Sequence, residues 1–110
     1  MNTSDLYELG FSEISHSRDR EITGGFCGDL LSWVMGRAKE GDLWFTIMGN
    51  INTIAVASLT DVSAVVFCEG VTAAEDVINK AGEEGINLFS TELPVFEAAT
   101  KFHDFCKDER

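Results

Sequence analysis

The chain has 110 residues, of which 45% are hydrophobic and 25% are charged, so it has room for one domain around one hydrophobic core. Its 19 acidic residues against 8 Lys and Arg give a formal net charge of −11. A surface of that sign repels nucleic-acid phosphates and anionic lipid, which argues against nucleic-acid binding and against attachment to a membrane.

The N-terminal residues and the cysteines indicate a cytoplasmic protein without a metal centre. No apolar run is long enough to span a membrane, and residues 1–5 lack the basic and apolar regions of a signal peptide. Cys27, Cys68 and Cys106 are odd in number and form no Cys-x-x-Cys pair, which argues against a disulfide framework, a zinc site or an iron–sulfur cluster. We expect free, mostly buried thiols and no cofactor.

The first segment, residues 1–20, is expected to pack on the domain or to extend it. Leu6, Tyr7 and Leu9 suit a short helix, and residues 11–14 suit a short extended piece. The domain itself is expected over residues 21–106. Residues 107–110 are expected to form a polar tail.

A bent strand is predicted over residues 21–28, where β-forming side chains alternate with glycines. Asp29 follows near the start of a helix that stops at Gly41. Trp33 falls outside the apolar stripe of this helix, and we expect it on the outer face. The stripe consists of Leu30, Leu31, Val34, Met35 and Ala38.

The remaining chain alternates strands and helices. Nearly continuous apolar runs at 43–48, 63–67 and 86–89 are typical of strands covered on both faces. The helices between and after these strands are predicted at 53–59 with Asn52 as N-cap, from a capping box Thr72-Ala73-Ala74-Glu75 to Gly85, and from about Leu93, where Pro94 suits the first turn. Their expected buried faces are Ala74, Val77, Ile78 and Ala81 in the second helix and Val95, Ala99, Phe102 and Cys106 in the third.

This order of elements predicts the fold class. Short connections between alternating strands and helices imply right-handed crossovers and parallel strands, with helices on both faces of the sheet. We therefore expect an α/β protein, a single three-layer domain with a mainly parallel sheet flanked by helices.

No catalytic machinery is recognisable in the sequence. The P-loop and the dinucleotide-binding Gly-x-Gly-x-x-Gly pattern are both absent. His16 and His103 lie near opposite ends of the chain, without neighbouring metal ligands at helical spacing. Cys106 follows His103 by three residues, which leaves a small hydrolase or transferase as an alternative. We predict no catalytic residue and no metal ligand.

Ligands of open α/β sheets bind beyond the carboxyl ends of the strands, where loops and helix N-termini converge. The acids Glu69 and Glu92 at this edge disfavour a polyanion unless a cation accompanies it. An alternative is that the glycines after the strand ends, Gly49 and Gly70, only form turns and that the polar residues there only cap helices. The predicted ligand-binding residues are Gly49, Asn50, Asn52, Glu69, Gly70, Thr72 and Thr91.

A family pattern extends over most of the chain, from about Arg20 to His103. It lies in residues 20–29, 41–47, 55–59, 69–71 and 81–90, in Thr91 and in Phe96-Glu97. In these segments the chain resembles a DRTGG domain, which is similar to the N-terminal domain of HPr kinase/phosphorylase. At the positions of the family's Asp-Arg and Thr-Gly-Gly residues this chain has Asn50-Ile51 and Cys68-Glu69-Gly70.

The resemblance implies a non-catalytic regulatory or protein-interaction module without the kinase domain. We expect a homodimer, with the aromatic residues Phe26 and Trp33 available for the interface. The alternative is a small-ligand sensor that binds an adenine nucleotide at the carboxyl edge, since DRTGG domains also occur between the CBS domains of regulated pyrophosphatases. Relatives encoded beside iron hydrogenase subunits further imply a partner in a redox or hydrogenase-type complex.

Overall fold

The computed structural model describes residues 1–108, and within them the strands form one five-stranded sheet in the order β1-β5-β4-β3-β2. The pairings among β2, β3, β4 and β5 are parallel, and β1 pairs with β5 in the antiparallel sense. The strands are β1 (Ser12–Ser15), β2 (Gly24–Cys27), β3 (Asp42–Thr46), β4 (Ala64–Phe67) and β5 (Leu88–Ser90). The predicted α/β class with a mainly parallel sheet is confirmed.

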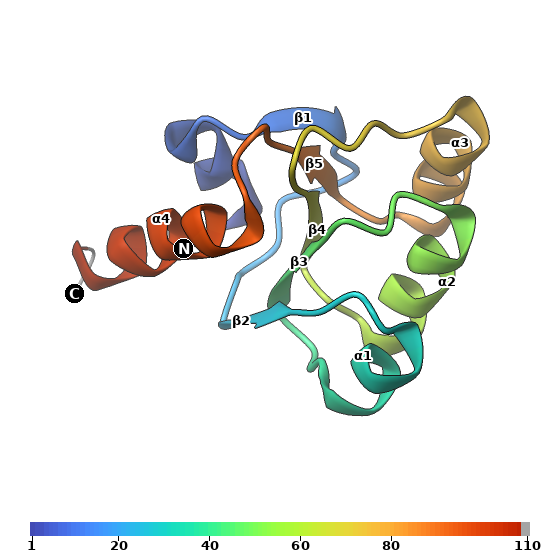
Figure 1. Ribbon diagram of the computed structural model, residues 1–110, viewed down its shortest axis with the longest axis horizontal. Coiled ribbons are helices and arrows are strands. Elements are labelled where there is room, and N and C mark those ends of the chain that lie inside the picture. Colours follow the sequence, from blue (N-terminus) through green and yellow to red (C-terminus); the bar gives the residue numbers. More distant parts are fainter. Residues whose placement is uncertain (109–110) are drawn as a thin grey trace.

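Helices cover both faces of this sheet, which gives the predicted three layers (Figure 1). One face carries α1, α2 and α3, and the other carries a 3-10 helix, η1, together with α4. Their bounds are η1 (Thr3–Leu9), α1 (Leu31–Arg37), α2 (Ile51–Thr60), α3 (Glu75–Glu84) and α4 (Val95–Asp108). Two residues of the predicted polar tail, 107 and 108, thus belong to α4, and 109–110 lie outside the described residues.

Residues 43–45 of β3 and all of β4 are apolar because both faces of these central strands are buried. In β3, Leu43 and Phe45 pack towards η1 and α4, whereas Trp44 packs towards the three-helix layer. The alternation continues in β4, where Val65 faces the three helices and Val66 the opposite layer. Side chains that alternate between two cores leave the strand without a polar face. Such a strand therefore appears in the sequence as a continuous apolar run.

The start of α2 corrects the predicted cap. Asn50, not Asn52, is the N-cap residue: its Oδ1 atom accepts hydrogen bonds from the backbone N–H groups of Asn52, at 3.0 Å, and Thr53, at 3.3 Å. The helix begins at Ile51, two residues before the predicted start. Either asparagine suits a helix start by residue type, and only the path of the chain after β3 decides which side chain reaches the free N–H groups.

Three further local predictions are wrong. The capping box at Thr72 is absent, because α3 starts at Glu75 with Ala74 at the N-cap position and no side-chain cap. Leu30 and Met35, predicted on the inner stripe of the first helix, are 61% and 50% exposed. The helix α1 is only seven residues long and buries Val34 alone, so most of the apolar stripe stays outside the core. Ile78, also predicted to be buried, is exposed on α3.

A polar cluster holds η1 against the segment that follows β1. The Thr3 hydroxyl lies 3.0 Å from Nε2 of His16 and donates to a carboxylate oxygen of Asp19 at 3.1 Å. On the other side of the imidazole, the Tyr7 hydroxyl lies 3.3 Å from Nδ1 and donates to Glu13. The backbone N–H of Ser4 also bonds Asp19, which holds the pKa of that carboxyl below its usual value. His16 is therefore part of a structural hydrogen-bond chain.

Asn87, next to β5, fixes the connection that leaves β1. Its Oδ1 atom accepts from the backbone N–H groups of Ser17, at 2.8 Å, and Arg18, at 3.3 Å. Its Nδ2 atom donates to the carbonyl oxygens of Arg18, at 2.8 Å, and Ser63, at 3.0 Å. The side chain is 1% exposed, so one buried amide satisfies backbone groups from two distant parts of the chain.

Among residues 1–108 there is no helix long and apolar enough to cross a membrane.

Candidate functional site

A hollow of about 230 Å³ lies at the carboxyl edge of the sheet, on the side covered by α3. The loops that follow β4 and β5 form its walls, together with the start of β1 and one residue of α3. Because β1 runs antiparallel to β5, its first residues lie beside the last residues of β5. The lining residues are Ser12, Ile14, Gly70, Val71, Thr72, Ala73, Ile78, Ser90, Thr91 and Glu92.

The loop after β4 turns sharply through two consecutive left-handed residues, Glu69 with φ 61° and Gly70 with φ 73°. Backbone hydrogen bonds then attach this loop to the loop after β5: the N–H of Glu69 donates to Leu93 O at 2.9 Å, and that of Gly70 to Thr91 O at 3.0 Å. A Cβ atom on Gly70 would lie 2.5 Å from a carboxylate oxygen of Glu92. The turn therefore needs glycine for its conformation and for its contact.

Three of the predicted ligand-binding residues, Gly70, Thr72 and Thr91, line this hollow together. Gly49 lies at its border, since a Cβ atom there would be 2.6 Å from Cγ1 of Val71. Asn50 uses its side chain to cap α2, as described above. The two remaining predicted residues, Asn52 and Glu69, are exposed and do not line the hollow.

The lining residues contributed by β1 and α3 were missed by the sequence reasoning. Ser12 and Ile14 alternate along one face of β1, but nothing local indicates that β1 pairs with β5. Ile78 was expected in the core and instead closes one side of the hollow. The alternation around Ile14 was the one available signal, and it identifies a strand without its neighbour.

The lining of the hollow suits an uncharged or cationic group, either a small molecule or the uncharged part of a larger one. Hydroxyl groups of Ser12, Thr72, Ser90 and Thr91 and the carboxylate of Glu92 face apolar side chains, and no Lys or Arg is among the described lining residues. Sites for drug-sized ligands measure about 300–1,000 Å³, so this hollow would hold a small molecule or one part of a larger one. The lining contains hydrogen-bonding groups but no cysteine or histidine to act as nucleophile or base.

The three thiols differ in their surroundings. Cys68 is fully buried, and burial raises the pKa of its thiol to about 12. Cys27 is exposed on the edge strand, contrary to the expectation of mostly buried thiols, and partial burial of its sulfur together with the Asp29 carboxylate raises its pKa. Cys106 points towards the N-terminus, with its Sγ atom 3.8 Å from Sδ of Met1.

Cysteine labelling is expected to separate Cys27 from Cys68. In the folded protein at pH 8, iodoacetamide should modify Cys27 slowly and leave Cys68 unmodified, because the buried thiol ionises only near pH 12 and is out of reach of the reagent. Peptide mass spectrometry after timed labelling measures both rates. In urea the two rates should converge, and modification of Cys68 in the native state at the rate of Cys27 would contradict the burial described here.

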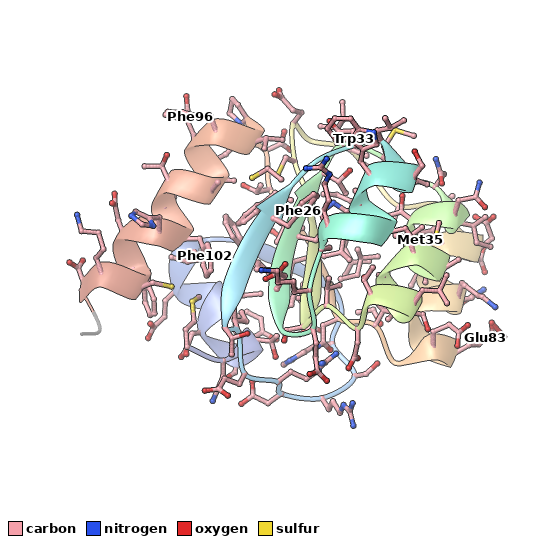
Figure 2. The ribbon with its side chains drawn as sticks, turned by 90° about the horizontal axis from the view of Figure 1, so that it is seen from below. Phe26, Trp33, Met35, Glu83, Phe96 and Phe102 are labelled. Atoms are coloured by element: carbon pink, nitrogen blue, oxygen red, sulfur yellow. The ribbon has the colours of Figure 1, made fainter. Side chains whose placement is uncertain are left out.

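The two aromatic residues predicted at an interface belong to consecutive elements, β2 and α1, and differ in exposure. Phe26 is half-buried against the three-helix layer, so part of its ring is covered within the domain and cannot contact a partner. Trp33 is 59% exposed at the end of α1 nearest the carboxyl ends of the strands (Figure 2). The Arg37 guanidinium lies 4.4 Å from the centre of the Trp33 ring, which is cation–π geometry. Trp33 is thus the more accessible of the two.

Fold and hollow together define a small α/β domain with a ligand-sized depression at the carboxyl edge of its sheet. A solved structure with this fold is the regulatory region, with CBS and DRTGG domains, of a Clostridium perfringens pyrophosphatase in complex with its activator diadenosine tetraphosphate. The TM-score is 0.72 at 16% sequence identity, and the match covers 86% of this chain and 42% of that chain. The likeness shows a shared fold, and the chain spans less than half of the neighbour's length.

No protein-family model and no curated protein matches the chain. The resemblance to a DRTGG domain therefore has structural support from the shared fold alone. Among residues 1–108, no group of three or more His, Cys, Asp or Glu side chains is arranged to hold a metal ion.

Proposed function

We propose that the chain is a non-catalytic regulatory module that binds a small ligand in the carboxyl-edge hollow. The observation that carries this proposal is the convergence of Gly70, Thr72 and Thr91 on one hollow, at the edge where open α/β sheets bind ligands. The left-handed turn at Glu69 and Gly70 holds the loops in position before any ligand arrives, which lowers the entropic cost of binding.

An adenine nucleotide is the ligand class that we propose first. The structural neighbour is described in complex with a dinucleotide activator, diadenosine tetraphosphate, and it shares this fold. The mixed apolar and hydroxyl lining suits the nucleoside part. Glu92 in the lining and Glu69 beside it repel phosphates, so a divalent cation would have to accompany the phosphate groups, or they would extend into solvent.

Calorimetric titration with adenosine, AMP, ATP with and without Mg²⁺, and diadenosine tetraphosphate tests this proposal. Saturable binding is expected for at least one of them, and Ser12→Leu, which fills the hollow from β1, should weaken it at least tenfold. Ser32→Leu is the matched control, since Ser32 is exposed on α1 away from the hollow. No binding across the panel, or equal effects of the two substitutions, would overturn the ligand proposal; conversion of the nucleotide would overturn the non-catalytic one.

A homodimer is the second candidate, and the open edge of the sheet favours it. β2 pairs with β3 on one side only, which leaves backbone groups of residues 24–27 available to a second copy of the chain. Light scattering after gel filtration at micromolar concentration measures the oligomeric state directly. A monomer would remove this candidate.

A partner in a redox or hydrogenase-type complex stays a prediction that the family resemblance alone supports. The cytoplasmic location stays a prediction from the sequence. A pull-down from native lysate addresses the partner. Recovery of hydrogenase or flavoprotein subunits in stoichiometric amounts would support it, whereas their absence from an otherwise productive pull-down would count against it.

A further inference from the structure

Large apolar side chains are exposed around the carboxyl ends of β2 and β3. Leu30 and Trp33 follow β2 and are 61% and 59% exposed, and Ile47 and Ile51 follow β3 and are 43% and 40% exposed. We call these four residues the β2–β3 patch. Figure 2 shows Trp33 at this end of the molecule, away from the sheet. Exposed apolar side chains from neighbouring loops are typical of a docking surface.

Hydrogen bonds join the two loops that carry the patch. One carboxylate oxygen of Asp29 accepts from the Thr46 hydroxyl at 2.8 Å and from the Ile47 N–H at 2.9 Å, which joins the loop after β2 to the loop after β3. The indole N–H of the buried Trp44 donates to Gly28 O at 2.9 Å. These hydrogen bonds fix the two loops to each other, and the four apolar side chains of the patch face solvent.

The second of these loops is also held in one conformation. Asn50 caps α2, and the Thr53 hydroxyl, which is fully buried, donates to Met48 O at 2.5 Å. Ile47 and Ile51 on either side are therefore presented by an ordered backbone. A surface ordered before binding loses little conformational freedom when a partner docks.

The charges at this edge select the kind of partner. Residues 28–33, 47–53, 68–76 and 90–98, which form the loops and first helical turns beyond the strand ends, contain no Lys or Arg. The guanidinium of Arg37 reaches the Trp33 ring from the last turn of α1. The acids in these segments are Asp29, Glu69, Glu75, Asp76, Glu92 and Glu97.

We propose that the β2–β3 patch docks a protein segment whose apolar side chains are flanked by Lys and Arg. The apolar residues of the segment would cover Leu30, Trp33, Ile47 and Ile51, and its basic residues would face the acids that follow β2, β4 and β5 at the same edge of the sheet. A second copy fits less well because it would bring two acidic edges together, and an anionic membrane is repelled for the same reason. This proposal goes beyond the ligand hollow and does not depend on it.

The fluorescence of Trp33 reports binding at the patch, because the other tryptophan, Trp44, is fully buried and does not respond to a ligand at the surface. The probes are two synthetic amphipathic helical peptides with the same apolar face, one with Lys and one with Glu on the polar face. The Lys peptide is expected to shift the Trp33 emission to shorter wavelength and to protect it from acrylamide, with affinity that falls as salt is raised. The Glu peptide should bind at least tenfold more weakly.

Leu30→Ser should weaken binding of the Lys peptide at least tenfold. Leu59→Ser is the matched control, because Leu59 is 73% exposed near the other end of α2. Both replaced side chains are exposed, and circular dichroism verifies that both variants fold. Equal binding of the two peptides, or equal loss in the two variants, would overturn the proposal. A dimer that Leu30→Ser dissociates would also overturn the proposal, as would binding to anionic vesicles that is stronger than binding to the Lys peptide. Ser12→Leu should leave peptide binding unchanged, which separates this test from that of the ligand hollow.

Discussion

Replacement of Asn87 by leucine is expected to lower the free energy of unfolding by about 3 kcal/mol. The substitution keeps the size of the side chain but removes four hydrogen bonds from a residue that is 1% exposed. The partner groups on Ser17, Arg18 and Ser63 would lose their partner, and a buried polar group without one costs about 1–3 kcal/mol. Urea denaturation followed by circular dichroism measures the loss.

Asn52→Leu is the control for this prediction, since Asn52 is exposed at the start of α2 and should change stability by less than about 0.5 kcal/mol. An Asn87→Leu protein as stable as the wild type would mean that the 15–18 connection finds other partners. The amide protons of Ser17 and Arg18 provide a second readout, because their hydrogen exchange should accelerate in Asn87→Leu alone.

Gly70→Ala is expected to destabilise the protein by about 2–3 kcal/mol and to abolish binding in the carboxyl-edge hollow. A left-handed conformation costs a residue with a Cβ atom about 1–2 kcal/mol, and the Cβ atom would also displace the Glu92 carboxylate, 2.5 Å away. Because Glu92 lines the hollow, the same change alters both the shape and the charge of the site. Thermal denaturation and calorimetric titration measure the two effects separately.

Gly85→Ala is a closely matched control. Gly85 has φ 69°, close to the 73° of Gly70, but a Cβ atom there would meet no heavy atom within 4 Å. It should therefore show the conformational cost of about 1–2 kcal/mol without any effect on the ligand site. If both variants lost the same stability and both still bound ligand, the contact between Gly70 and Glu92 would have no functional role.

The elements that could be predicted from the sequence are those whose pattern reflects burial on both sides. The apolar runs in β3 and β4 predict central parallel strands, because no other common arrangement buries every residue of a short strand. The inner stripe of α1 was predicted less well. Its apolar residues satisfy helical periodicity, yet a seven-residue helix cannot bury them all, and Leu30 and Met35 remain at the surface.

The candidate site could be predicted only where it is local in sequence. Gly70 and Thr91 follow strand ends, and the general position of ligands in α/β sheets points to them. Thr72 was expected at a helix cap as an alternative, but α3 begins later and leaves it facing the hollow. Ser12 and Ile14 depend on the pairing of β1 with β5, which no local pattern encodes.

The antiparallel position of β1 has a consequence for the order of folding. Successive strands from β2 to β5 are neighbours in the sheet, so each pairing can form as soon as one crossover is complete. Ser12, by contrast, pairs with Ser90, so the first strand must wait until almost the whole chain has been made. Closure of such a long loop is slow compared with local pairing. We therefore expect β1 to join last during synthesis, and the hollow that it completes to form in the same step.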